Sequence, residues 1–245
     1  MIALGGKTVF GATVGILMLE TRFPRIPGDM GNALTWPFPV HYRVVRGASP
    51  DMVVRKDPSA LKDAFIEAAK DLVATGADGI TTNCGFLCRF QKDLASAVGV
   101  PVAASSLMQV PLVNATLPEG KRAGILTISS ATLSPALLAA AGVPADTPII
   151  GTEGGREFTR AILDDEGEMN VALARQDLLD AAAALVTDRP EIGAIVLECT
   201  NMVPYAADIR RLTGLPVYSI YSFVSWFQAG LLPPRFAEHH DDPRY

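Results

Sequence analysis

The 245-residue chain lacks several features that would assign it to a broad class. It has no uninterrupted run of about 20 apolar residues, so no membrane span is expected. Three cysteines are too few, and odd in number, for a disulfide framework, which points to a reducing, cytoplasmic location. No second Cys or His pair accompanies Cys84 and Cys88, so we expect no metal site. A net charge of −5 argues against nucleic acid or an anionic membrane as the main partner.

The chain contains a long internal repeat. With 49% hydrophobic and 19% charged residues it can bury a sizeable core, as one large α/β domain or as two lobes. Residues 77–84 (ADGITTNC) correspond to 192–199 (IGAIVLEC), and 99–102 (GVPV) to 214–217 (GLPV), both at an offset of 115. Each copy reads as a strand, a cysteine, a helix, a glycine and a second strand.

Strands and helices alternate along both copies. We expect helices over 57–75, 86–98, 107–117, 133–141, 168–187 and 202–212, with strands over 79–82, 100–104, 124–128, 147–151 and 192–197. The apolar stretch 8–19 is interpreted as a first core strand and not as a signal peptide, because no small-residue cleavage site follows it. The prediction is an α/β fold of two pseudo-symmetric lobes, each a mainly parallel sheet flanked by helices, with the active site in the cleft between them. Lobe 1 is assigned to 1–112 and lobe 2 to 113–217, with 218–245 returning to lobe 1 and 233–245 loosely held.

Cys84 and Cys199 each stand at a strand end, immediately before a helix. Free amides in the first turn of a helix favour a thiolate, so both thiol pKa values are expected to be lowered, and the same amides can hold a carboxylate. Gly85 would let the backbone approach a ligand closely. The short polar side chains around the two cysteines would supply hydrogen bonds (Thr82, Asn83, Thr200 and Asn201). The alternative is that both cysteines simply pack as small apolar residues, which is the interpretation given to Cys88.

Two further segments are candidates for substrate contact. The Pro- and Gly-rich stretch 21–32 follows the first strand; it is either a lid in which Arg22 or Arg25 meets an anion, or an ordinary surface connection. Ser129 and Ser130 follow the strand 124–128 and either bind substrate or cap the next helix. The segment 151–155 lacks the pattern of a phosphate loop and is expected to be a turn.

At Asn83-Cys84-Gly85 and Glu198-Cys199-Thr200-Asn201 the chain resembles the aspartate/glutamate racemase superfamily, including its hydantoin racemase-like members. The resemblance covers nearly the whole chain. It implies a cofactor-independent enzyme, a homo-oligomer, with Cys84 and Cys199 as the two acid/base residues. It also implies a substrate site lined by Thr82, Asn83, Gly85, Phe86, Ser129, Ser130, Thr200 and Asn201. Glutamate racemases carry Asp-Ser-Gly, Cys-Asn-Thr and Cys-Thr-His motifs, from which this chain departs at Glu20-Thr21-Arg22, at Gly85-Phe86 and at Asn201.

The function expected from these features is racemisation of an amino acid, a hydantoin or a related carboxylate, without pyridoxal phosphate. One thiolate would remove the Cα proton and the opposite thiol would protonate the other face. Two alternatives remain open at this stage. One is a decarboxylase, another lyase or a cis–trans isomerase in which a single cysteine reacts. The other is a two-lobed binding protein that has lost catalysis.

Overall fold

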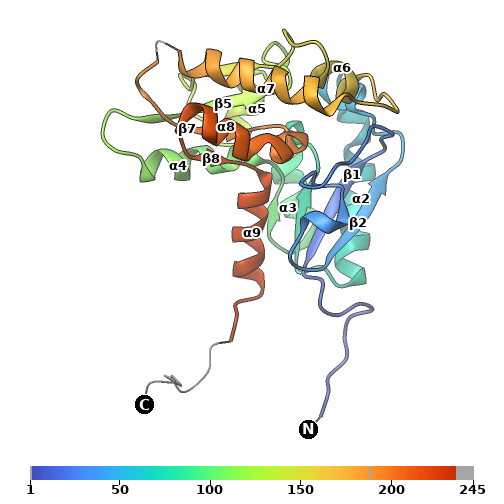
Figure 1. The fold of residues 1–245 in the computed structure, drawn as a ribbon. Coiled ribbons are helices and arrows are strands. Elements are labelled where there is room, and N and C mark those ends of the chain that lie inside the picture. Colours follow the sequence, from blue (N-terminus) through green and yellow to red (C-terminus); the bar gives the residue numbers. More distant parts are fainter. Residues whose placement is uncertain (1, 188, 236–245) are drawn as a thin grey trace, which may run out of the picture.

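The computed structural model describes residues 2–187 and 189–235 (Figure 1). The predicted histidine-containing tail from 236 onward lies outside the described residues. In the first half of the chain the elements are β1 (Val14–Leu19), η1 (Ala33–Thr35), β2 (Val40–Val45), α1 (Pro50–Val54), η2 (Ser59–Leu61), α2 (Lys62–Thr75), β3 (Gly79–Thr82), η3 (Gly85–Phe90), α3 (Gln91–Val98), β4 (Val102–Ala103), η4 (Ser106–Gln109) and α4 (Val110–Thr116), where η denotes a 3₁₀ helix.

The second half repeats this order. Its elements are β5 (Arg122–Thr127), α5 (Pro135–Ala140), β6 (Ile149–Gly151), α6 (Phe158–Leu163), α7 (Val171–Val186), β7 (Ile192–Leu197), η5 (Thr200–Tyr205), α8 (Ala206–Thr213), β8 (Val217–Tyr218) and α9 (Ile220–Leu231). In the described part of the chain, none of these helices has the length and apolar character needed to cross a lipid bilayer.

Two four-stranded parallel sheets form the framework, in the orders β2-β1-β3-β4 and β6-β5-β7-β8. The strand that precedes each cysteine lies beside the opening strand of its own sheet, β3 beside β1 and β7 beside β5. Parallel strands place their carboxyl ends at one edge of a sheet, where open α/β sheets bind ligands. The predicted fold class is therefore confirmed, and each cysteine follows the end of a central strand.

Several elements differ from the sequence prediction. The stretch from Asp57 begins as the short 3₁₀ helix η2, and α2 starts only at Lys62, because the Asp57 side chain accepts hydrogen bonds from Ser59 instead of capping the long helix. The segments behind both cysteines open as 3₁₀ turns, η3 and η5, before α3 and α8. Strand β2 and the short helices α1 and α6 were not predicted, and neither was α9, although its buried residues follow the i, i+3, i+4, i+7 spacing of a helix face.

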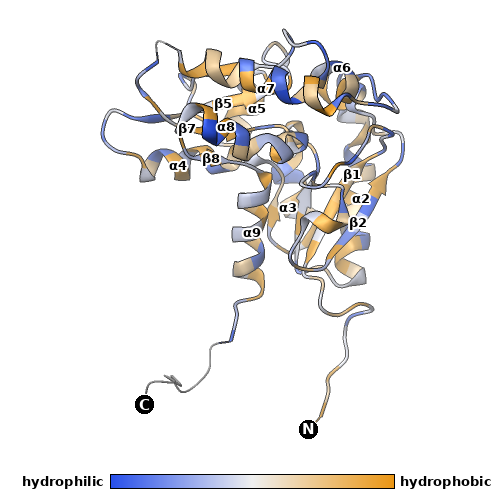
Figure 2. Cartoon of the chain, viewed as in Figure 1, coloured by the Kyte–Doolittle hydropathy of each residue, from blue (hydrophilic) through white to orange (hydrophobic). Residues whose placement is uncertain are grey.

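The core consists of apolar strands covered by helices. All six residues of β1 are buried, and five of the six in β5 and in β7. After β8 the chain enters α9, whose apolar residues are seen in Figure 2. Ile220, Phe223, Val224 and Phe227 of this helix form a buried cluster with Val14 and Ile16 of β1, so the end of the described chain packs on the first sheet. The exact boundaries of the two lobes stay a prediction.

Candidate active site

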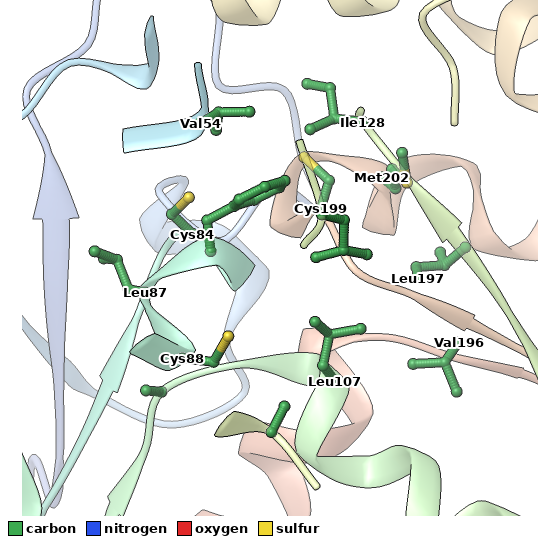
Figure 3. Packing of buried hydrophobic residues seen from close by; sticks show 14 of the residues in the cluster. Val54, Cys84, Leu87, Cys88, Leu107, Ile128, Val196, Leu197, Cys199 and Met202 are labelled. Carbon is green, nitrogen blue, oxygen red and sulfur yellow. The ribbon is translucent and has the colours of Figure 1, made fainter. Parts of the chain in front are cut away.

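The two cysteines of the repeat line one small, mainly apolar cavity, whose free volume is about 20 Å³. Figure 3 shows Cys84 and Cys199 on ribbons from different halves of the chain, with the sulfur of Cys88 apart from theirs. Both cysteines are nearly buried, with exposed fractions of 9% and 7%. The other lining residues are Leu19, Thr21, Phe23, Arg25, Pro50, Val54, Asn83, Gly85, Phe86, Ile128, Ile162, Leu163, Glu198 and Asn201. The duplication therefore brings both thiols to a single site between the sheets.

Each thiol occupies the N-terminal cap position of a 3₁₀ helix, as the strand–cysteine–helix pattern predicts. Neither sulfur accepts a capping hydrogen bond, but the backbone N–H groups of Phe86 and Asn201 act on the Cys84 and Cys199 sulfurs in the direction that lowers the thiol pKa. The side-chain oxygen of Asn201 also lies 3.4 Å from the Cys199 sulfur and accepts its S–H. The local geometry around the sulfurs is thus the expected one.

The net direction of both pKa shifts is opposite to the sequence prediction. Burial raises the pKa of the Cys84 and Cys199 thiols well above the ordinary value, and the neighbouring carboxyl of Glu198 raises both further. The amide contacts are too weak to offset the loss of solvation of a thiolate in an apolar cavity. Both groups are therefore thiols.

Glu198 is a buried acid in the same cavity, with an exposed fraction of 1%. Its Oε2 accepts a hydrogen bond from the Thr127 hydroxyl at 2.8 Å. Its Oε1 packs against Gly85, where an added Cβ would lie 2.2 Å from it. Burial raises the pKa of this carboxyl to about 7. The close approach that Gly85 permits in this structure is that of Glu198.

Arg25 is the cationic side chain of the cavity. Its guanidinium donates to Asp29 at 2.9 Å and to Thr21 at 2.9 Å, and lies 4.3 Å from the centre of the Phe23 ring. The buried Asp29 also accepts from the side-chain amide of Asn201 at 2.6 Å. A guanidinium has five N–H donors, so Arg25 keeps donors for a bound anion. The Asp29 contact also fixes the Asn201 amide, because a carboxylate can only face its NH₂ end, and this leaves the Asn201 oxygen toward Cys199.

Arg22, the other predicted lid residue, lies outside the cavity with 80% of its side chain exposed. Its backbone N–H donates to the Asp165 carboxylate of the second half at 2.6 Å, and the N–H of Phe23 to the same oxygen at 3.2 Å. Asp165 has a φ of +54°, the one non-glycine residue with positive φ among the described residues. These contacts tie the loop 21–32 across the cavity to the segment after α6.

The remaining predicted site residues fall into two groups. Asn83, Gly85, Phe86 and Asn201 line the cavity. The hydroxyls of Thr82 and Thr200 donate to the backbone carbonyls of Ala104 and Asn83, and Ser130 donates to Glu153. Ser129 is buried beside Thr127, and its neighbour Ile128 lines the cavity instead. The assignment of Thr82, Thr200, Ser129 and Ser130 as substrate ligands stays a prediction.

Sequence reasoning missed two acidic residues of the site. Glu198 could have been identified from the sequence, because burying a glutamate at the end of an apolar strand and next to a cysteine costs free energy. Asp29 could not, because it stands in a Gly- and Pro-rich stretch where aspartate is an ordinary turn residue. In residues 2–187 and 189–235, no group of three or more His, Cys, Asp and Glu side chains has the arrangement of a metal site.

Curated relatives cover most of the chain. A dimethylsulfoniopropionate lyase of Durusdinium sp. clade D is 28% identical over 234 residues, which are 92% of this chain and 77% of the relative. Dimethylsulfoniopropionate lyase 7 of Emiliania huxleyi (strain CCMP1516) is 30% identical over 238 residues, 91% of this chain and 69% of the relative. No family model matches the chain.

Solved structures with the same fold include both isomerases and lyases. Allantoin racemase from Klebsiella pneumoniae superposes with a TM-score of 0.60 at 18% identity, over 93% of this chain and 97% of its own. Unliganded arylmalonate decarboxylase superposes with a TM-score of 0.53 at 15% identity, over 94% and 97%. The fold expected from the racemase resemblance is thus confirmed, while this fold by itself does not determine the reaction.

Proposed function

This chain belongs to the family of the dimethylsulfoniopropionate lyases, with the fold of the Asp/Glu racemase superfamily, and we propose that it cleaves dimethylsulfoniopropionate or a closely similar sulfonium carboxylate by β-elimination. One observation carries the proposal. Two thiols from the two halves of the chain, together with the guanidinium of Arg25, line one small and largely apolar cavity. That arrangement suits the removal of a proton from a carbon next to a carboxylate.

The racemase prediction is wrong, because the curated relatives are lyases and not isomerases. The prediction failed because the cysteine motifs indicate only the first chemical step and not the step that follows it. They mark a site that removes a proton next to a carboxylate, which is the first step of racemisation and also of β-elimination. The fate of the carbanion depends on the substrate: a good leaving group on the next carbon departs before a second thiol can return a proton.

The proposed step conserves atoms and charge. One of the two cysteines first gives its thiol proton to water, and the resulting thiolate takes a proton from the carbon next to the carboxylate. The electron pair of that C–H bond forms a C=C bond as the bond to the sulfonium sulfur breaks, which releases acrylate and neutral dimethyl sulfide. The cysteine is again a thiol, as at the start, one proton has been released to water, and no oxidant or further reactant is consumed.

Arg25 and the apolar walls have distinct roles in this step. As the proton leaves, negative charge grows on the substrate carboxylate, and the donors of Arg25 that its protein partners leave free stabilise it. The walls exclude water, which would otherwise solvate the thiolate and weaken these contacts. A thiolate is unfavourable in this buried cavity, and the positive sulfonium group of the substrate lowers the cost of forming it.

The test is release of dimethyl sulfide, measured in the headspace by gas chromatography, together with acrylate in solution. We expect Cys84→Ser or Cys199→Ser, whichever removes the proton acceptor, to lose about 100-fold or more in kcat. Cys88→Ala is the matched control, because the Cys88 sulfur faces the Leu137 carbonyl and does not line the cavity. Absence of both products from the folded wild-type protein, or wild-type turnover in both serine variants, contradicts the proposal.

A further inference from the structure

Glu198 is buried without a positive partner. Its exposed fraction is 1%, and its carboxyl is held by the Thr127 hydroxyl and the backbone N–H of Ile128, at 2.8 and 3.5 Å. Among the described residues no cationic side chain forms an ion pair with it, and none contributes to its pKa. An unpaired buried carboxyl costs several kcal/mol if it is ionised, so such a group marks a functional position more often than a structural one.

The position of Glu198 is fixed from two sides. Thr127, at the end of β5, holds one carboxyl oxygen, and Gly85 at the start of η3 packs against the other. The side chain therefore cannot turn away into solvent, and it lines the cavity that contains both thiols. A cation bound in this cavity would meet the carboxyl where it stands, although the cavity, with a free volume of about 20 Å³, must widen to admit a substrate.

The charges of the cavity match a substrate with two unlike ends. Among the described lining residues Arg25 carries the one positive charge and Glu198 the one carboxyl group, and the rest are apolar or neutral. Because Arg25 is already paired with Asp29, its field does not neutralise Glu198. The unmatched group of the site is thus an acid.

We propose that Glu198 is the anionic partner of the substrate's sulfonium group and selects substrates that carry a positive charge at the end opposite their carboxylate. This inference rests on the proposed function for the identity of the cation. Ionised Glu198 beside the sulfonium stabilises the bound substrate. As the C–S bond breaks, that positive charge disappears, so the attraction is weaker in the transition state than in the bound ground state. Glu198 therefore acts on binding more than on the chemical step.

Binding of a cation here is coupled to loss of a proton. The titratable groups that face Glu198 are Cys84 and Cys88, on the η3 side, and its neighbour Cys199; on the β5 side Thr127 and Ile128 are uncharged. All three thiols hold their protons because burial raises their pKa values. The proton released when a cation binds at neutral pH is thus that of Glu198, whose pKa of about 7 leaves it partly protonated.

Two inert carboxylates test the inference without catalysis. One replaces the dimethylsulfonium group by trimethylammonium, and the other replaces it by the neutral tert-butyl group of the same shape. We expect the wild-type protein to bind the cationic compound roughly 30-fold or more tightly than the neutral one, and Glu198→Gln to remove that preference. Calorimetry in buffers of different ionisation enthalpy should show proton release for the cationic compound alone.

Kinetics with dimethylsulfoniopropionate give the second measurement. We expect Glu198→Gln to raise KM by roughly 30-fold or more without lowering kcat, because the attraction that is lost is stronger in the bound substrate than in the transition state. Glu157→Gln is the matched control, since Glu157 is a buried glutamate of the same half that pairs with Arg160 and does not line the cavity. A fall in kcat at unchanged KM, or equal affinity of the wild-type protein for both compounds, overturns the inference. If the protein binds the cationic compound selectively yet releases no dimethyl sulfide, the proposed function fails and the role of Glu198 stands.

Discussion

The buried carboxyl of Glu198 makes stability depend on pH in a way that Glu198→Gln should abolish. Burial raises the pKa of this group from 4.5 to about 7 in the folded protein. Between these two values the folded protein keeps a proton that the unfolded chain has lost. Below the unfolded-state pKa of 4.5, burial of this group therefore costs no folding free energy. The cost grows as pH rises toward the folded-state pKa of about 7, and it is constant above that pKa.

The size of the penalty follows from the shift. A rise from 4.5 to about 7 corresponds to about 3 kcal/mol above neutral pH, and to about 1 kcal/mol at about pH 5. Glutamine stays neutral and has no such penalty. We therefore expect the free energy of unfolding of Glu198→Gln, relative to wild type, to increase by about 2–3 kcal/mol between about pH 5 and about pH 8.

Urea unfolding followed by circular dichroism measures this difference, with both proteins studied over the same series of pH values. Comparing the pair at each pH cancels every other titrating group and any pH-independent cost of the glutamine. For Glu157→Gln the difference from wild type in free energy of unfolding should stay nearly constant over this pH range. The reason is that the hydrogen bond from the Asn170 N–H lowers the pKa of Glu157 and leaves it ionised. A constant gap for Glu198→Gln as well would mean that Glu198 is ionised and compensated in the folded protein, and the reasoning would be refuted.

Three further substitutions probe the surroundings of the cavity. Gly85→Ala places a Cβ 2.2 Å from a Glu198 carboxyl oxygen, and we expect it to cost about 1–3 kcal/mol in urea unfolding and to weaken substrate binding; unchanged stability would show that the carboxyl does not pack there. Asp29→Ala leaves Arg25, whose side chain is 15% exposed, without its carboxylate partner. We expect it to destabilise the protein by about 3 kcal/mol and to lower kcat; unchanged stability and unchanged kcat would show that the Asp29–Arg25 pair does not hold the site. Asp165→Ala removes the carboxylate that holds the loop 21–32, so hydrogen exchange of the loop amides should accelerate and KM should rise; unaltered exchange would show that this contact does not hold the loop.

The repeat made much of the fold predictable. Strands β3 (Gly79–Thr82) and β7 (Ile192–Leu197) lie where the apolar runs before the cysteines place them. Apolar runs and glycine stops are local signals, and the constant offset of 115 supports each with its copy. Strand β2 escaped prediction because it is an edge strand with one buried residue, and a half-exposed parallel strand has no strong period of its own.

The candidate site was predictable only in part. The pairing of Cys84 with Cys199 followed from the repeat, since equivalent strand ends of two related lobes can face one cleft. The choice between the two loop arginines did not follow, because Arg22 and Arg25 stand three positions apart in an irregular segment. Only the folded loop turns Arg25 into the cavity and leaves Arg22 exposed beside Asp165.

The sequence by itself determined an α/β chain of two related halves, with a cysteine at the end of a central strand in each, because hydrophobic patterning and internal repetition are written along the chain. The tertiary structure alone decided the charge states within the site. Sequence position predicted lowered thiol pKa values, whereas burial raises them and also raises that of Glu198. The cost of charging a group depends on how much water the surrounding residues exclude, and at this site they come from distant parts of the chain.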